Sequence, residues 1–230
     1  MRLLAWNIRH GGGRRLPAIF DALAGHAPDV VVFCEYRRST GPMLRAALVR
    51  LGYPFATGVE PPGGRNGVLI AARRSLRGSR VLSHRVEEPY RLIQAELACG
   101  LQLAGVYMPN LLRKVPYWEA VLRAARRRRG GDAIFVGDFN TTRHFIDEAG
   151  TVCLTSQYMD HIERAGFRDA WRHRHPAARE FSWYSHKGNG YRLDHAFCSQ
   201  ALVSRIAAIR YSHDERRRGL SDHSAIVLDL

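Results

Sequence analysis

Lysine and cysteine are the scarce residues of this 230-residue chain. The four cysteines lie far apart in the sequence, and none belongs to a CxxC pair: Cys34, Cys99, Cys153 and Cys198. This spacing argues against a structural zinc site and against a disulfide framework. Cys34 and Cys198 lie in apolar runs typical of strands, so we expect buried, reduced thiols of the kind found in cytosolic proteins.

Long apolar runs are also absent. No stretch approaches the ~18 consecutive apolar residues that a membrane-spanning helix requires. The first residues, MRLLAWNIRHGGG, lack the apolar segment of a secretory signal peptide. We therefore expect a cytoplasmic protein that does not contact a membrane, and nothing in the sequence indicates an obligate protein partner.

Acidic residues are few relative to basic ones: 35 Lys+Arg stand against 21 Asp+Glu, a net charge of +14. Only Lys114 and Lys187 are lysines, so arginine carries nearly all of the positive charge. A strongly basic protein is attracted to nucleic acid, because binding releases condensed counterions. A GC-rich genome would enrich arginine without any such function, and both explanations stay open. The run Arg126–Arg129 is likewise either a solvated helix end or a contact with a phosphate backbone.

Short β-rich runs alternate with amphipathic helical patterns along the chain, and 46% hydrophobic residues suffice for a large core. The predicted strands are Leu3–Ile8, Val30–Cys34, Gly67–Ala72, Arg91–Leu97, Leu101–Met108, Ala133–Val136, Tyr191–Cys198, Arg205–Tyr211 and Ala225–Leu230. The predicted helices are Leu16–Gly25, Pro42–Leu51, Val115–Arg129 and Gln157–Ala165. No repeat or linker divides the chain, so we predict one α/β domain over residues 1–230. Two sheets would pack face to face with helices outside.

Polar residues that packing does not explain cluster at the ends of these runs. They are Asn7, Glu35, Tyr107, Asp138, Asn140, Asp194, Asp222 and His223. Taken singly, such a residue is more often a helix cap or a turn residue. Recurrence at the same kind of strand boundary indicates a site. Asp194 lies inside an otherwise apolar strand and needs a partner if it is buried.

The chemistry of this set is coherent. Glu35 and Asp222 are hard oxygen ligands of the kind that Mg²⁺ takes. Asp194 is the natural residue to orient His223 and to make it more basic. Asp138 can orient or deprotonate a water molecule, and Asn140 can position that water. Such a set suits in-line attack on a phosphorus centre, where positioning and charge neutralisation supply most of the catalysis.

In their order along the chain, these residues resemble the endonuclease/exonuclease/phosphatase superfamily. The matching motifs are WN at 6–7, the isolated Glu35, YxPN at 107–110, GDFN at 137–140, RLDH at 192–195 and SDH at 221–223. The resemblance implies the DNase I-like fold, a four-layer α/β sandwich of two mixed β-sheets flanked by helices, with the site at one rim. It implies Mg²⁺ on Glu35 with Asn7 and Asp222 nearby, and Mn²⁺ as a substitute. It also implies that Tyr107 contacts the phosphate and that His223 stabilises charge on the phosphoryl oxygens.

The segment Phe181–Leu202 resembles the exonuclease III and apurinic-endonuclease branch in particular. In that branch two aromatic residues and a leucine line a pocket for a flipped-out abasic sugar. Trp183, Tyr191 and Leu193 match those positions, and Asn110 is a further candidate substrate contact. Core packing explains the three apolar residues equally well, and that alternative stays open.

Two departures from that branch bear on the site. Arg9 stands where some members carry an acidic residue near the metal, which favours one ion over two. The stretch between Asn110 and Gly137 is compact, so loops that grip DNA are expected to be reduced. His144, in GDFNTTRHF, stays outside the expected catalytic set.

Three functions remain after these observations. The first is Mg²⁺-dependent hydrolysis of DNA, with abasic sites as a candidate substrate. The second is the same chemistry on a phosphoinositide, sphingomyelin or nucleotide, since the catalytic motifs are shared. The third is a binding protein with a relict site. It would require a broken constellation, whereas every central position carries the expected residue type.

Overall fold

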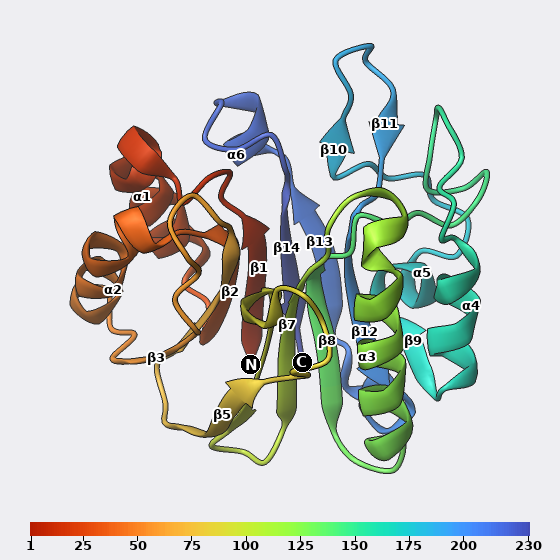
Figure 1. Ribbon diagram of the computed structural model, residues 1–230, viewed down its shortest axis with the longest axis horizontal. Helices are drawn as coiled ribbons and strands as arrows, with labels where there is room; N and C mark the ends of the chain where they lie inside the picture. The colour runs from red at the N-terminus through yellow and green to blue at the C-terminus, as the bar shows by residue number, and fades with distance from the viewer.

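The computed structural model describes residues 1–230, and its framework is a pair of six-stranded β-sheets (Figure 1). The first sheet has the strand order β13-β14-β1-β2-β4-β3. β1 lies parallel to β2 and antiparallel to β14, so the first and last strands of the chain are neighbours. The strands are β1 (Arg2–Asn7), β2 (Val30–Tyr36), β3 (Phe55–Thr57), β4 (Gly67–Ala72), β13 (Ala208–Ser212) and β14 (Ala225–Asp229).

The second sheet has the order β5-β6-β7-β8-β12-β9. Only β7 and β8 pair in parallel, so this sheet is also mixed. The strands are β5 (Leu76–Val81), β6 (Leu92–Leu97), β7 (Gln102–Tyr107), β8 (Ala133–Asp138), β9 (Phe167–Asp169) and β12 (Asp194–Ser199). A separate hairpin of β10 (Trp183–Tyr184) and β11 (Gly190–Tyr191) rises above the upper rim in Figure 1.

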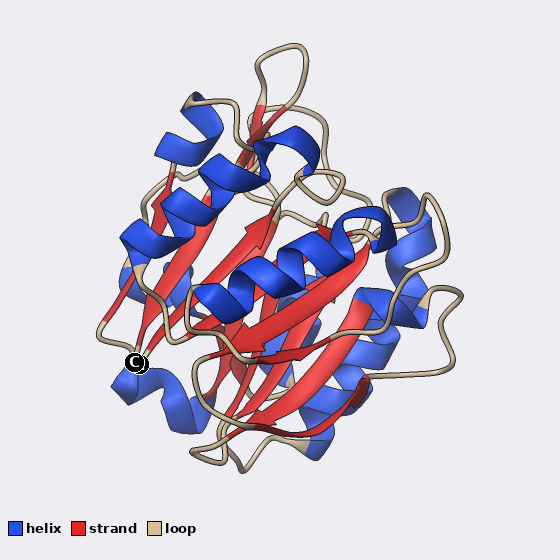
Figure 2. Ribbon diagram, turned by 90° about the vertical axis from the view of Figure 1, so that its left-hand side faces the viewer, coloured by secondary structure: helices blue, strands red, loops and turns tan.

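Helices cover the outer faces of both sheets and complete four layers (Figures 1 and 2). α1 (Leu16–His26) and α2 (Gly41–Arg50) pack on the first sheet. α3 (Val115–Arg127) and α4 (Gln157–Arg164) pack on the second. The largest hydrophobic cluster lies between the sheets. The predicted four-layer α/β sandwich is therefore confirmed.

The alternation of side chains along the strands produces these layers. In β1, Leu3 and Ala5 face the other sheet, whereas Leu4 and Trp6 face the helices. The two sheets approach each other closely at Gly105 of β7. A Cβ atom there would lie only 2.7 Å from a methyl carbon of Val68 in the opposite sheet, so the sequence needs glycine at this position.

A buried charge network joins the second sheet to the loop that follows β8. Arg192 is fully buried, and its Nη2 atom lies 2.7 Å from Asp147 Oδ2 and 2.6 Å from Asp169 Oδ2. Burial alone would raise the pKa of Asp169, but Arg192 holds it well below its usual range. Removing one partner from such a network leaves an unpaired buried charge, which is strongly destabilising.

The four predicted helices are all present, and the predicted strands are found with two changes. The run Tyr191–Cys198 divides, because Arg192 turns into the charge network and β12 begins only at Asp194. The run Arg205–Tyr211 becomes a strand only from Ala208, after a short 3₁₀ turn. Sequence patterns missed the six-residue strand β5 and the short elements β3, β9, β10, α5 (Ala170–Arg174) and α6 (Asp214–Arg217). None of the helices is both long and apolar enough to cross a membrane.

Candidate active site

Four of the expected site residues end the inward-facing rows of their strands. In β8, Val136 faces the core between the sheets, and Asp138 is the next residue of the same row. Asn7 has this relation to β1, Tyr107 to β7 and Asp194 to β12. These positions therefore extend the inter-sheet core to one rim of the sandwich. There the strand register sets Asp138 beside Tyr107 of β7 and Asp194 of β12, and Asn7 of the other sheet reaches Asp138 over 3.0 Å.

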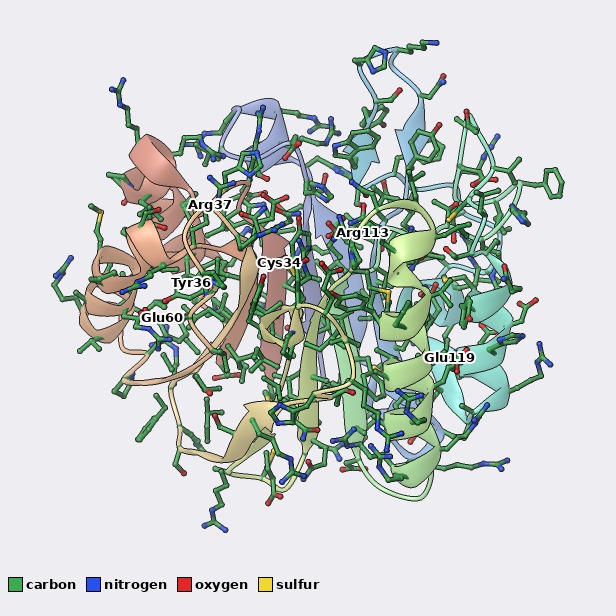
Figure 3. All side chains as sticks on the ribbon, in the orientation of Figure 1. Cys34, Tyr36, Arg37, Glu60, Arg113 and Glu119 are labelled. Atoms are coloured by element: carbon green, nitrogen blue, oxygen red, sulfur yellow. The ribbon has the colours of Figure 1, made fainter.

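Glu35 reaches this rim through an irregularity in β2. Cys34 faces the inter-sheet core, so strict alternation would turn the next residue towards the helices. The pairing of β2 with β4 shifts register between Cys34 and Tyr36, and Glu35 has a left-handed backbone with φ of 61°. A bulge of this kind re-aims a side chain, and bulges are frequent beside active sites. Figure 3 labels Cys34 and Tyr36, the residues that flank it.

Hydrogen bonds hold the Glu35 carboxylate in one orientation. Asn7 Nδ2 donates to Oε1 over 3.2 Å, and Asn66 Nδ2 donates to Oε2 over 3.0 Å. The backbone N–H of His10 also donates to Oε2, over 2.7 Å. The imidazole Nδ1 of His10 lies 2.9 Å from the same oxygen. Glu35 nevertheless remains half-buried and borders the cavity described below.

Asp138 is buried at the centre of the cluster. Asn7 Nδ2 donates to its Oδ2 atom over 3.0 Å, and the backbone N–H of Asn140 donates to Oδ1 over 2.9 Å. Burial raises the pKa of Asp138 to about 7, an effect that His223 opposes and Asp194 reinforces. A carboxyl group with a pKa near neutrality is suited to take a proton from water at physiological pH.

His223 and Asp194 form a buried pair. His223 Nδ1 lies 2.8 Å from Asp194 Oδ2, and the opposite ring nitrogen, Nε2, lies 3.9 Å from Asp138 Oδ2. Burial by itself would lower the pKa of His223, but Asp194 and Asp138 outweigh it and raise the pKa to about 10. The imidazole therefore carries a positive charge at neutral pH, with Nε2 directed towards Asp138.

Asn140 is fixed at the turn that follows β8. Its backbone is left-handed, with φ of 47°, and its Nδ2 atom donates to the Met108 carbonyl over 2.7 Å. The ammonium group of Lys114, which is buried, donates to the Asn140 backbone carbonyl. Burial lowers the pKa of Lys114, while Cys153 and Asp138 oppose that effect. Lys114 thus stabilises the GDFN turn from the start of α3.

Tyr107 joins the Glu35 side of the cluster. Its hydroxyl donates to Glu35 Oε1 over 3.4 Å and accepts from Asn66 Nδ2 over 3.5 Å. The Arg91 guanidinium lies over its ring, 4.4 Å from the centroid. Burial, reinforced by Glu35, raises the pKa of Tyr107 well above its usual value. The phenol therefore keeps its proton at neutral pH and can donate a hydrogen bond.

A cavity of about 590 Å³ opens beside these groups. Its polar wall contains Glu35, Tyr107, Asn110, Asp138, Asn140, Asp222 and His223. Trp183, Tyr191 and Leu193 form part of its apolar wall, and the rings of Trp183 and Tyr191 lie 5.8 Å apart. These three side chains are only partly buried and belong to none of the three hydrophobic cores. Core packing therefore does not account for them.

Two of the residues expected to hold a metal offer the donor atoms that a hard divalent ion takes. Glu35 and Asp222 both border the cavity and offer carboxylate oxygens. Asn7 turns its amide nitrogen towards Glu35 and Asp138, while its Oδ1 atom accepts the backbone N–H of Arg9 over 3.0 Å. Ligation by Asn7 would therefore require its amide to turn over.

A second group of acidic and imidazole side chains does not suit a metal. Asp147, Asp169 and His195 lie close enough to share an ion. The guanidinium of Arg192 fills the space between the two carboxylates and satisfies them. This group is therefore part of the structural framework.

Three further residues of the cluster carried no sequence signal. Asn66 lies in the turn segment EPPGGRN, whose composition predicts a turn and nothing about its side chain. His10 follows the WN motif, and Lys114 resembles any helix-start lysine. His144, which sequence analysis left outside the set, does not border the cavity, and its Nδ1 atom lies 3.3 Å from Glu148 Oε1.

Comparisons with known proteins agree with this geometry. The model of the Endonuclease/Exonuclease/phosphatase family matches residues 4–223. No match was found among curated proteins. A 3′ phosphatase from Neisseria, solved with a product DNA hairpin, has a TM-score of 0.88 at 23% identity, covering 100% of this chain and 99% of its own. A 3′-5′ exonuclease from Neisseria meningitidis has a TM-score of 0.87 at 22% identity, covering 100% and 99%.

An AP endonuclease from Archaeoglobus fulgidus also has a TM-score of 0.87 at 22% identity, covering 99% of this chain and 98% of its own. At these identities the likeness concerns the fold. The family match extends from the first strand to the SDH motif, so it includes every motif of the cluster as well as Trp183, Tyr191 and Leu193. The chain belongs to the endonuclease/exonuclease/phosphatase family and is a metal-dependent hydrolase of phosphoester bonds.

Proposed function

We propose that this protein hydrolyses phosphodiester bonds in DNA with Mg²⁺, acting at abasic sites or at 3′ ends. One observation carries the proposal: Glu35, Asp138 and the His223–Asp194 pair converge on one wall of a cavity whose other wall is aromatic and apolar. The DNA-bound Neisseria 3′ phosphatase shares this fold over its whole length. The net charge of +14 favours a polyanionic substrate.

The residues divide the chemistry among them. Asp138 takes a proton from the attacking water, which Asn140 positions. His223, held in its charged form by Asp194, stabilises the negative charge that develops on the phosphoryl oxygens. Tyr107 donates a hydrogen bond to the phosphate. Because hydrogen bonds already hold these side chains in place, they need little reorganisation when the phosphate binds.

Glu35 and Asp222 would hold the divalent ion, with Asn7 joining them if its amide turns. When bound, the ion would supply a Lewis acid that neutralises charge on the phosphate. Asn7, Asn66 and the His10 backbone keep the Glu35 carboxylate aimed at that position. Oxygen ligands of this kind favour Mg²⁺, with Mn²⁺ as a substitute.

The aromatic wall would receive the sugar of the damaged nucleotide. Trp183, Tyr191 and Leu193 leave a volume that an abasic sugar can enter, and Asn110 borders the same space. Extrusion into the cavity costs least where base pairing is already lost. The pocket would therefore select abasic nucleotides over intact ones.

The test is cleavage of a duplex that contains one tetrahydrofuran abasic analogue, with Mg²⁺ or with EDTA. We expect Mg²⁺-dependent cutting that Asp138→Asn lowers by about 10³-fold or more, because the substitution removes the proton acceptor. Asp160→Asn, at an exposed position on α4, is the matched control and should retain activity. Absence of cutting on damaged DNA, intact DNA and RNA alike would rule the proposal out.

One observation favours a second candidate, a phosphodiesterase acting on a lipid-like substrate. Large apolar side chains are exposed at or near the mouth of the cavity: Leu111, Leu112, Val152 and Leu154. They suit an apolar tail as well as a nucleotide. Salt separates the two substrates, because KM for DNA should rise steeply with added salt and KM for a neutral lipid should not. Hydrolysis of sphingomyelin that exceeds hydrolysis of DNA would favour this candidate.

A further inference from the structure

A second hollow lies at the end of α3 that is remote from the active site. Its volume is about 420 Å³, and it is lined by Arg126, Arg129, His161, Arg164 and Ala165. α3 runs from the upper rim in Figure 1 to the opposite end of the molecule, with α4 beside it. The last turns of these two helices supply Arg126, His161 and Arg164, and Arg129 lies two residues beyond the end of α3. No acidic side chain lines the hollow.

The charges of this hollow are not balanced by the protein. Arg126, Arg129 and Arg164 have no carboxylate within ion-pair distance, and the nearby Asp160 and Glu163 are both engaged by Arg143. The C-terminal ends of α3 and α4 each contribute about −0.5 of an elementary charge, about −1 together. Asp160, Glu163 and Arg143 carry a net charge of −1, so the three guanidinium groups of the hollow leave about +1 uncompensated. The solvated helix end considered from sequence explains only part of this charge.

The backbone shapes the hollow as well. Gly166 ends α4 with a left-handed φ of 94°, and a Cβ atom there would lie 2.8 Å from Arg129 Cγ. The stem of Arg129 therefore lies across a glycine that leaves room for it. This contact joins the residues after α3 to the end of α4 and keeps the arginines on one surface.

We propose that this arginine hollow binds phosphate groups of a nucleic-acid strand, as an anchor outside the active site. The inference rests on the proposed function, because that function supplies the polyanion. Arginine presents a planar fork that matches phosphate oxygens. Lys114 borders the active-site cavity at the start of α3, and Arg126 borders the hollow near its end. At about 1.5 Å of rise per residue, the two sites are about 18 Å apart.

That separation predicts that binding affinity depends on the length of the nucleic-acid strand. Stacked nucleotides advance about 3.4 Å each, so a strand needs about five nucleotides to pass from one site to the other. A trinucleotide therefore reaches only one site, whereas a 20-nucleotide strand can occupy both. The anchor should strengthen binding of the long strand and leave the trinucleotide unaffected.

The test measures binding without chemistry, on a background that carries Asp138→Asn. One variant adds Arg126→Gln, Arg129→Gln and Arg164→Gln. The matched control instead adds Arg50→Gln, Arg74→Gln and Arg77→Gln, which remove the same charge from exposed positions outside the hollow. Fluorescence anisotropy gives Kd for a labelled single strand of 20 nucleotides and for a trinucleotide over a range of salt concentrations. Circular dichroism melting confirms that all three proteins are folded.

We expect the hollow variant to bind the long strand at least about 10-fold more weakly than the background protein. Its salt slope should fall by about 0.7 for each phosphate lost. Trinucleotide binding should be unchanged in both variants, and the control should lose much less affinity for the long strand. Equal losses in the hollow and control variants would overturn the anchor while leaving the proposed function intact. Binding of pyrophosphate in the hollow, without any effect of the hollow substitutions on DNA affinity, would also overturn the anchor. If none of these proteins bound DNA, both the anchor and the proposed function would be overturned.

Discussion

Removal of the charge on Asp194 tests the electrostatics of the site most directly. At an effective dielectric constant of about 20, opposite charges at the observed 2.8 Å separation attract by about 6 kcal/mol. This free energy corresponds to about four pKa units. Asp194→Asn should therefore lower the pKa of His223 from about 10 to about 6. The imidazole would then be largely neutral at pH 7.5.

The assay is a histidine NMR titration from pH 5 to pH 11 in EDTA, because the pKa of about 10 refers to the protein without a metal ion. Comparison with His223→Gln assigns the resonance among the 11 histidines. Asp21→Asn, on the exposed face of α1, is the control and should leave the titration unchanged. A wild-type His223 pKa below 7, or a pKa that Asp194→Asn does not move, would refute the reasoning.

The same substitution has a consequence for stability. The pKa of His223 is raised on folding, so its contribution to stability is complete below about pH 6.5 and disappears as the pH rises through about 10. Wild-type stability should therefore fall across that window. Asp194→Asn should lose this pH dependence, and its phosphodiesterase kcat should fall by about 10²-fold or more because the transition state loses a positive charge.

Three further substitutions test the metal site and the framework. Glu35→Gln should weaken Mn²⁺ binding, measured by EPR, by more than about 100-fold, because even residues that only orient metal ligands contribute about 10- to 100-fold to affinity. The control Glu60→Gln should leave Mn²⁺ binding unchanged. Equal Mn²⁺ binding by both variants would exclude Glu35 as a ligand. Arg192→Met should lower the free energy of unfolding in urea by about 3–5 kcal/mol, because it removes the buried guanidinium shared by Asp147 and Asp169. Arg172 then remains at ion-pair distance from Asp147, and His195 from Asp169. Arg205→Met, which breaks an exposed pair with Asp132, should cost about 1 kcal/mol or less, and similar losses would contradict this account. Gly137→Ala should lower the free energy of unfolding by about 3 kcal/mol in the same assay, because the φ of residue 137 is 137° and the new Cβ atom would lie 2.2 Å from the Val106 carbonyl oxygen. An unchanged urea midpoint would show that β7 can move to accommodate the methyl group.

Local patterns were sufficient for the four longest helices, for the long strands other than the exposed edge strand β5, and for the layer order. Apolar residues recur about every 3.6 residues in a helix and every 2 residues in a strand. Backbone geometry sets both repeats, so they are visible in a short stretch of sequence. The two-residue alternation along strands also explains why Asn7, Tyr107, Asp138 and Asp194 could be recognised as candidate site residues. Each continues an inward-facing apolar row by one polar residue, and a polar residue there needs a partner.

Short elements were beyond such patterns. β3, β9 and β10 have two or three residues each, too few to show a period, and they form because a neighbouring strand offers free hydrogen-bonding groups. The break before β12 could not be predicted from local sequence either. Arg192 leaves the strand because it pairs with Asp147 and Asp169, which are distant from it in the sequence.

By itself, the amino-acid sequence determined the α/β sandwich and the kinds of group that its rim would carry, because alternation and side-chain chemistry are local properties. Only the tertiary structure decided how those groups act. It aimed Glu35 through a bulge, placed Asn66 and His10 on its carboxylate, and gave His223 and Asp138 their altered pKa values. The physical reason is that burial and charge–charge distance depend on residues that meet only after the two sheets have packed.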